Sequence, residues 1–356
     1  MVNSAACVIN KTDVDAWLAR MLREREVIAP TRGAGGDEIF APIATPGEVL
    51  WAFGNPIGPP KQFLLPQTEP IAHFRRRDGH VEVTPAEAPP PRVLFNVRSC
   101  DASGLAYLRE IYARDLPDDA VERRAASLTV VTLACVVPCE LGFCVCSDAG
   151  PFLRRDFDLQ LTDLGSAFFV DEGSEKGRAL LALAPSLFRE PLPAERAQRD
   201  GAERDVLGRF GGETCHFASA MRRVSTRRVP PELWESMSPW CVECGGCTHV
   251  CPTCYCFSVA DEGGTGECAT RCRLWDSCQY AEFTLEASGH NPRATHAERI
   301  KRRFHHKVSA QYFRRDGRVG CVGCGRCVRV CMGALDMPAV VAAIRHGQWD
   351  GGRLRG

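Results

Sequence analysis

The pattern of hydrophobic and polar residues near the start of the chain predicts a helix. Thr12 and Asp13 suit its N-terminus, because short polar side chains accept hydrogen bonds from the first free backbone amides. The apolar residues that follow recur at helical spacing: Val14, Trp17, Leu18, Met21 and Leu22. They lie on one face of the predicted helix.

Short apolar runs farther along predict strands that alternate with helices. The expected strands are residues 93–97, 128–133 and 167–170. The expected helices are residues 105–112 and 178–183. This alternation predicts a mixed α/β domain over residues 1–190.

The second half of the chain has a different character. Residues 191–232 are charged and bounded by prolines, which predicts a solvated linker of one or two helices. Residues 233–345 hold two cysteine runs separated by 69 residues that look helical, with Asn291 and Pro292 as a helix start. We expect an α-helical ferredoxin domain there, an α+β fold for the whole chain, and a flexible tail at 346–356.

The composition shows balanced charge and an excess of cysteine. The 356 residues include 44 Lys+Arg and 44 Asp+Glu, so the chain as a whole has no bias toward nucleic acid. The longest apolar stretch is about ten residues, whereas a membrane-spanning helix needs about 20. The first residues lack the basic and apolar segments of a secretory signal. We therefore expect a cytoplasmic protein, without a membrane span, whose 20 cysteines lie in reducing surroundings.

Two runs of the form Cys-x2-Cys-x2-Cys-x3-Cys carry the clearest chemistry. This spacing is typical of [4Fe–4S] cubanes, and in two-cluster ferredoxins the fourth cysteine of each run binds the other cluster. We therefore predict a first cluster on Cys241, Cys244, Cys247 and Cys331. The second is predicted on Cys321, Cys324, Cys327 and Cys251. Pro252 follows the first run as the motif expects, whereas Met332 replaces the second proline.

Zinc and disulfides are the alternatives for these cysteines. Structural zinc sites usually divide four cysteines into two Cys-x2-Cys pairs, and a third closely spaced cysteine has no role there. Disulfides need oxidising surroundings and are typical of short secreted domains. The spacing favours iron–sulfur clusters over both.

A second group of cysteines lies in the N-terminal half. Cys100 and Cys135 each follow a predicted strand, and Cys139, Cys144 and Cys146 come soon after. Strand-end cysteines can converge in an α/β layer, so a third cluster is physically reasonable. Their spacing is not a standard cluster motif, and redox-active thiols or buried structural cysteines remain alternatives.

Other residues around the runs have less defined roles. Five cysteines lie beside the first run without a motif of their own: Cys254, Cys256, Cys268, Cys272 and Cys278. Residues 290–331 contain eleven Lys or Arg against two acidic residues. Such cations would stabilise anionic clusters or steer an acidic partner, or else form an ordinary solvated helix face. No phosphate-binding loop, dinucleotide motif or hydrolytic triad is visible, so the pattern indicates electron transfer without a substrate site.

Three segments resemble a known family. They are residues 240–257, residues 275–292 with the sequence Trp275-Asp276-Ser277-Cys278, and residues 320–327. Together they look like the iron–sulfur β subunit of cytoplasmic nickel–iron sulfhydrogenases, which is similar to the A subunit of anaerobic sulfite reductase. The resemblance extends to Cys100, Cys135, Cys144 and Cys146 as ligands of a third cluster, with Cys139 as an extra cysteine. The family's Arg-Pro-Cys-Asp is Arg98-Ser99-Cys100-Asp101 here, so the turn before Cys100 differs.

The resemblance implies an electron-transfer subunit that does not itself catalyse the reaction. It implies two or three [4Fe–4S] clusters and two partners, a flavin- and NAD(P)-binding subunit and a catalytic subunit such as a nickel–iron hydrogenase. A subunit of a sulfite or sulfur reductase is the nearest alternative. A reductase with its own N-terminal thiol or flavin site is another, and a redox sensor is a third.

Overall fold

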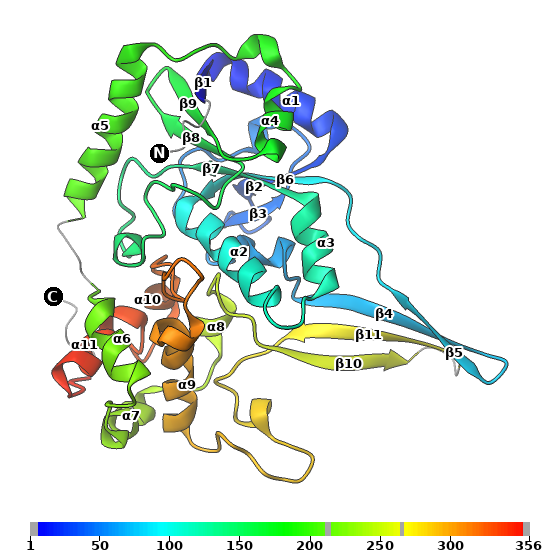
Figure 1. Cartoon of the computed structure of the whole chain (residues 1–356), viewed down its shortest axis with the longest axis vertical. Helices are drawn as coiled ribbons and strands as arrows, with labels where there is room; N and C mark the ends of the chain where they lie inside the picture. The colour runs from blue at the N-terminus through cyan, green and yellow to red at the C-terminus, as the bar shows by residue number, and fades with distance from the viewer. Residues whose placement is uncertain (1–5, 211–214, 264–266, 352–356) are drawn as a thin grey trace.

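The computed structural model describes residues 6–210, 215–263 and 267–351. A seven-stranded sheet forms the N-terminal half, a helical body holds the C-terminal cysteine runs, and a narrow four-stranded arm extends from between them (Figure 1). The observed architecture is α+β, as the sequence predicts.

The large sheet has the strand order β1-β9-β8-β7-β6-β2-β3. Its centre is parallel: β2 pairs with β6, β6 with β7, and β7 with β8. The outer strands β1, β9 and β3 are antiparallel to their neighbours. The strand bounds are β1 Ala6–Asn10, β2 Glu26–Arg32, β3 Glu38–Pro42, β6 Arg92–Arg98, β7 Leu128–Leu133, β8 Leu159–Asp163 and β9 Ala167–Glu172.

Helices cover both faces of this sheet, so its central strands are buried on both sides. On one face α1 (Val14–Glu24) and α4 (Glu175–Leu181) pack over Val93 and Phe95. On the other face α2 (Ser99–Tyr112) and α3 (Asp119–Ser127) pack over Leu94 and Val97. The predicted apolar face of α1 is confirmed, with Trp17, Leu18 and Met21 fully buried.

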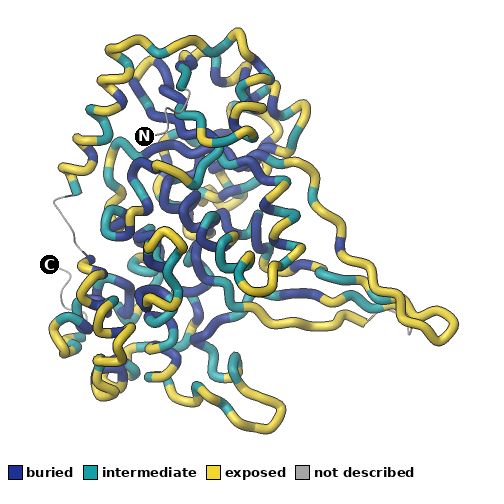
Figure 2. The backbone as a smooth tube through the Cα atoms, viewed as in Figure 1, coloured by how far each residue is buried: buried dark blue, intermediate teal, exposed yellow. Residues whose placement is uncertain are grey.

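The arm combines strands from both halves of the chain. Its order is β10-β11-β4-β5, antiparallel throughout, and the bounds are β4 Thr68–Arg77, β5 His80–Pro85, β10 Phe257–Gly263 and β11 Cys268–Trp275. Figure 2 shows the arm exposed along much of its length, in contrast to the buried large sheet. Arg273 anchors its base through ion pairs to Glu69 and to Asp118, the N-cap of α3.

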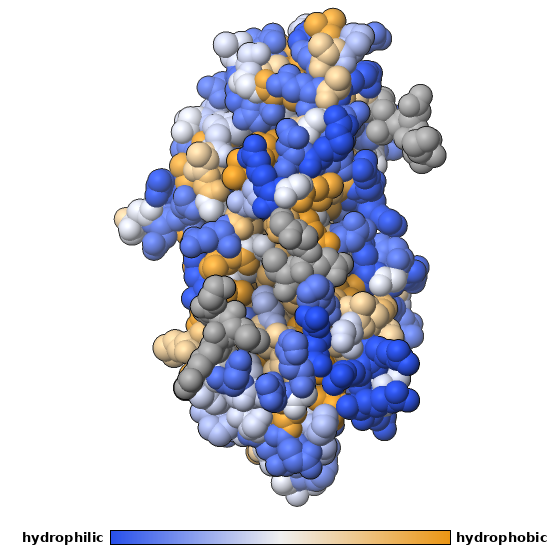
Figure 3. All heavy atoms as spheres, turned by 90° about the vertical axis from the view of Figure 1, so that its left-hand side faces the viewer, coloured by the Kyte–Doolittle hydropathy of each residue, from blue (hydrophilic) through white to orange (hydrophobic). Residues whose placement is uncertain are grey.

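The helical body packs around one apolar cluster that includes Trp234, Phe304 and Ile344. Its helices are α6 Phe217–Ser225, α7 Pro231–Met237, α8 Gly246–His249, α9 His296–Val308, α10 Arg326–Val330 and α11 Met337–His346. Helix α5 (Pro193–Arg209) lies apart from this body on the largely hydrophilic face seen in Figure 3.

The structure departs from three predictions for the second half of the chain. The 69 residues between the runs are not all helical, because β10 and β11 occupy the first part and pair with β4. Helix α9 begins at His296 instead of Pro292, because Thr295 and Glu298 form a capping box there. In the expected tail, Trp349 packs edge-on against Trp240, and residues 352–356 lie outside the described residues.

Candidate metal centres

The two cysteine runs fold into the same local structure. In each run a residue with positive φ, Glu243 or Gly323, follows the first cysteine by two positions. A left-handed glycine, Gly245 or Gly325, then starts a short helix that carries the third cysteine. Glycine is favoured at these positions because it adopts positive φ without a steric penalty. The repeated turn directs three cysteines of each run toward a common centre, as cubane ligation requires.

The last cysteine of each run lies near the first three cysteines of the other run. Cys241, Cys244, Cys247 and Cys331 line one pocket, although Cys331 is far away in the sequence. Burial raises the pKa values of the Cys321, Cys324 and Cys327 thiols. The charge of nearby Cys251 also raises each of these three pKa values. The structure therefore brings together the two crossed sets that the spacing predicts. We call them cage 1, which contains Cys331, and cage 2, which contains Cys251.

Three buried cations lie around the cages. Lys61, Arg303 and Lys307 are each exposed by 5% or less. Within the described residues none of them forms an ion pair with a carboxylate. Their hydrogen bonds go to backbone carbonyls and Thr253, and Arg303 Nε has no partner in the described structure. Cysteines exert the strongest favourable electrostatic effect on all three cations.

Unpaired buried cations indicate an anionic group in the same place. Burial disfavours the charged forms of Arg303 and Lys307, yet neighbouring cysteines hold both pKa values above their usual range. A buried charge without a counter-ion is strongly destabilising. Clusters held by four thiolates are net anionic, so the donor set and its surroundings both fit [4Fe–4S] clusters. The basic stretch is accordingly not a simple solvated face, because Arg299, Arg303, Lys307 and Arg326 are buried.

Replacing Lys307 by Met is expected to lower the reduction potential measured for the clusters. The ammonium group favours the more negative, reduced state, and its loss removes that stabilisation. A difference of roughly 1.4 kcal/mol corresponds to about 59 mV for one electron, and we expect at least this shift. Lys301→Met is the matched control, since Lys301 is exposed on the same helix. Anaerobic redox titration followed by EPR measures both, and equal potentials at unchanged iron content would contradict the assignment.

The N-terminal cysteines line a cavity of about 530 Å³ beside cage 2. Cys100, Cys135, Cys139 and Cys144 lie on its wall together with Cys324 of cage 2. Cys146 is not on that wall; its sulfur accepts a hydrogen bond from Cys215 N at 3.3 Å. The loop carrying Cys139 and Cys144 rests directly on the second run, where Phe143 N donates to Gly323 O at 2.8 Å.

A buried ion pair joins the second run to the N-terminal domain beside this cavity. Arg326 binds both carboxylate oxygens of Asp101, at 2.5 and 2.9 Å, and its Nε donates to Pro56 O at 2.6 Å. Asn55 adds a hydrogen bond to Cys324 O at 2.9 Å. Because Asp101 follows Cys100 directly, the pair fixes the N-terminal cysteine site relative to cage 2.

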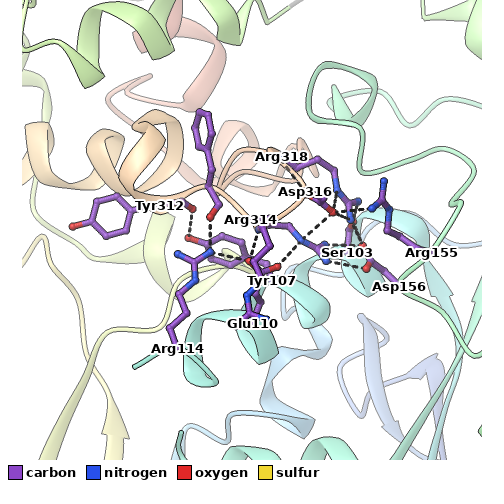
Figure 4. Close-up of polar contacts among 12 residues, drawn as sticks. Ser103, Tyr107, Glu110, Arg114, Arg155, Asp156, Tyr312, Arg314, Asp316 and Arg318 are labelled. Carbon is purple, nitrogen blue, oxygen red and sulfur yellow. Dashed lines mark hydrogen bonds and ion pairs between the residues drawn. The ribbon is translucent and has the colours of Figure 1, made fainter. Parts of the chain in front are cut away.

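The segment before the second run is held by a second ionic network (Figure 4). Arg314 contacts both oxygens of Asp156, at 2.7 and 2.9 Å, and Arg318 contacts the same carboxylate at 2.7 Å. Burial disfavours ionised Asp156, but the two arginines hold its pKa below its usual range. Glu110 of α2 also accepts from Arg314, at 3.3 Å. These contacts position the chain that leads into Cys321.

Sequence patterns did not identify several of these residues. Lys61 follows a proline pair and has no motif or periodic partner, so nothing along the chain marks it as buried between distant loops. Asn55 is likewise distant from the second run in the sequence and contacts it only in the folded chain. Asp101 was visible only as part of the Arg98–Asp101 resemblance, without its partner Arg326.

Two further observations concern sites for a single metal ion and helices that could span a membrane. Across residues 6–210, 215–263 and 267–351, no three His, Cys, Asp or Glu side chains are grouped closely enough for a single metal ion. A cubane instead distributes its thiolates over four separate irons. Within the same ranges no helix combines the length and the apolar character needed to span a bilayer.

Comparison with known proteins finds one matching domain family and a similar curated relative. Residues 240–335 match the 4Fe-4S dicluster domain. Over 316 residues the chain is 29% identical to sulfhydrogenase 2 subunit beta of Pyrococcus furiosus, covering 86% of this chain and 89% of the relative. No solved structure matches. The chain is thus similar to a hydrogenase subunit along most of its length, and its dicluster domain indicates [4Fe–4S] clusters.

Proposed function

We propose that this chain, an iron–sulfur electron-transfer subunit related to sulfhydrogenase β subunits, relays electrons between two partner subunits. One partner binds flavin and NAD(P), and the other is catalytic, such as a nickel–iron hydrogenase. The observation that carries this proposal is the pair of crossed thiolate cages with buried, unpaired cations around them.

The residues of the chain have defined roles in this function. Cys241, Cys244, Cys247 and Cys331 hold one cluster, and Cys321, Cys324, Cys327 and Cys251 hold the other. When bound, these clusters would exchange single electrons with their neighbours. Lys61, Arg303 and Lys307 offset the negative charge, and the apolar cluster with Trp234 and Phe304 packs against one side of the cages.

A third cluster in the N-terminal cavity belongs to the same proposal. Cys100, Cys135 and Cys144 line the cavity and match the ligands that the family resemblance implies. Cys139 lies on the same wall and supplies the fourth sulfur in place of Cys146. Because Cys324 borders this cavity, the third site adjoins cage 2 and extends the path for electrons into the N-terminal domain.

Iron analysis tests the third site. Anaerobically reconstituted protein should contain about twelve irons per chain, four for each of three cubanes. Cys139→Ala should lower this to about eight, whereas Cys146→Ala should leave it near twelve. Matching acid-labile sulfide and EPR signals are measured on the same samples. The reverse result for the two variants would assign the fourth ligand to Cys146, and eight irons in all three proteins would remove the third cluster.

The cavity also keeps a second function under consideration. Its volume of about 530 Å³ lies within the range of roughly 300–1,000 Å³ typical of small-molecule sites. A reductase with its own N-terminal thiol or flavin site would use such a space. A catalytic partner of the anaerobic sulfite reductase type would also be compatible with the two cages.

Activity of the isolated chain separates these functions. We expect anaerobic, cluster-loaded protein to accept electrons from dithionite but not to oxidise hydrogen or NAD(P)H, and not to reduce sulfite or sulfur. Copurification from the native host should recover a flavin-containing subunit and a catalytic subunit, whose nickel or sirohaem content identifies the reaction. Turnover by the chain alone would show that it is a reductase and would overturn the relay function.

A further inference from the structure

Three cysteines outside the proposed ligand sets line one small pocket beside both cages: Cys254, Cys256 and Cys278. Cys256 immediately precedes β10, and Cys278 lies three residues beyond β11. Pairing of these strands continues past their ends, where Asp276 N donates to Cys256 O at 3.0 Å. This pairing brings the two thiols into contact, and Cys256 donates a hydrogen bond to the sulfur of Cys278.

The surroundings of this pair suit thiol chemistry. Arg303 and Lys307 line the same pocket, and nearby cations favour the reactive thiolate. Cys256 is partly exposed and can meet a small molecule, whereas Cys278 is only 3% exposed and lies behind it. Cys254 is differently engaged, because it donates a hydrogen bond to Cys251 of cage 2.

We propose that Cys256 and Cys278 form a redox-active dithiol that small organic disulfides oxidise reversibly to an intramolecular disulfide. The proton that Cys256 donates to Cys278 moves onto the Cys278 sulfur, and the Cys256 thiolate attacks one sulfur of the disulfide R–S–S–R. The S–S bond breaks, a mixed disulfide forms, and the released sulfur takes up a proton as R–SH. Cys278 then attacks the Cys256 sulfur and releases the second R–SH. The protein loses two electrons and two protons, and both appear in the two R–SH molecules.

The dithiol is connected to cage 1 through Gln279. The amide Nε2 of this buried residue donates to Cys278 Sγ at 3.4 Å, and its Oε1 lies 4.0 Å from Cys241 Sγ. Closing the disulfide changes the acceptor at Cys278 and so the orientation of the Gln279 amide beside a cage sulfur. Hydrogen bonding to the sulfurs is one of the factors that set the potential of a cluster. The pair therefore makes cage 1 responsive to the surrounding thiol–disulfide balance.

The test uses the full cluster-loaded chain in anaerobic glutathione buffers of increasing disulfide content. Free thiols are alkylated, and peptide mass spectrometry locates any disulfide. We expect a single two-electron transition that joins Cys256 to Cys278, with unchanged iron content. Absence of this disulfide at a large excess of glutathione disulfide overturns the proposal.

Variants separate a dithiol from a metal ligand. In Cys278→Ser we expect Cys256 to remain as a mixed disulfide with glutathione, and in Cys256→Ser we expect no disulfide at this position. Cys268→Ser is the control, because Cys268 is exposed at the far end of the same hairpin and should leave the pair unaffected. Loss of iron in Cys256→Ser or Cys278→Ser would overturn the dithiol in favour of a cluster ligand. If the wild-type protein does not retain iron even without glutathione disulfide, that result counts against the relay function and not against the dithiol.

Discussion

Cys251→Ala should remove the cluster bound by the second run and leave the cluster of its own run in place. Cys251 lies among the buried sulfurs of Cys321, Cys324 and Cys327, so its loss leaves cage 2 with three ligands. We expect a loss of about four irons per chain. Iron and sulfide analysis with EPR measures the loss, and alanine is preferred because serine can itself bind iron.

Double variants identify which cluster was lost. If Cys251 serves cage 2, adding Cys321→Ala to Cys251→Ala should cause little further loss of iron. Adding Cys244→Ala should remove about four more, because Cys244 belongs to cage 1. The opposite pattern would show that each run binds its own cluster with its own fourth cysteine.

Asp101→Ala should be the most destabilising single change at the interface between the N-terminal domain and the second run. Asp101 and Arg326 are 0% and 2% exposed, and no other carboxylate pairs with Arg326 in the described part of the chain. Removing one partner of a buried ion pair typically costs about 3–5 kcal/mol, because the remaining charge is left uncompensated. The change in free energy of unfolding follows from urea denaturation of anaerobic protein with matched iron content.

Two further variants test the cause of this loss. Asp205→Ala is the surface control on α5, where an exposed carboxylate should matter by about 0.5 kcal/mol or less. The double variant Asp101→Leu with Arg326→Met should be more stable than Asp101→Ala, because it leaves no unpaired charge. A cost below about 1 kcal/mol for Asp101→Ala would mean that the buried pair contributes little to the interface.

Local patterns predicted β6, β7 and β9 of the large sheet, because short apolar runs mark these strands. They did not predict β1, β2, β3 and β8. The strand at residues 128–133 has the predicted bounds, and α1 buries the predicted face. Helix α2 begins at Ser99, six residues before the expected start, so Cys100 lies in its first turn and not at a strand end. The polar residues of that turn do not show helical periodicity, because Ser99, Asp101 and Ser103 are themselves buried.

The arm was not predictable from local pattern. Strands β4 and β11 lie about 200 residues apart in the chain and are held together by pairing over that distance. A charged residue such as Arg273 suggests an exposed strand until Glu69 and Asp118 are placed beside it. Boundaries at residues 190, 232 and 345 remain predictions.

The sequence alone predicted which cysteines form the two cages, because their spacing within each run is typical of cubane ligands. It also predicted β6 and β7 of the parallel layer, since strands buried on both faces need uninterrupted apolar runs. Only the tertiary structure decided what surrounds those ligands. Lys61, Asp101 and the cysteines of the N-terminal cavity reach the runs across about 180 to 225 residues of chain. Electrostatic compensation of buried charge depends on distance in space, and no feature of the order of residues records that distance.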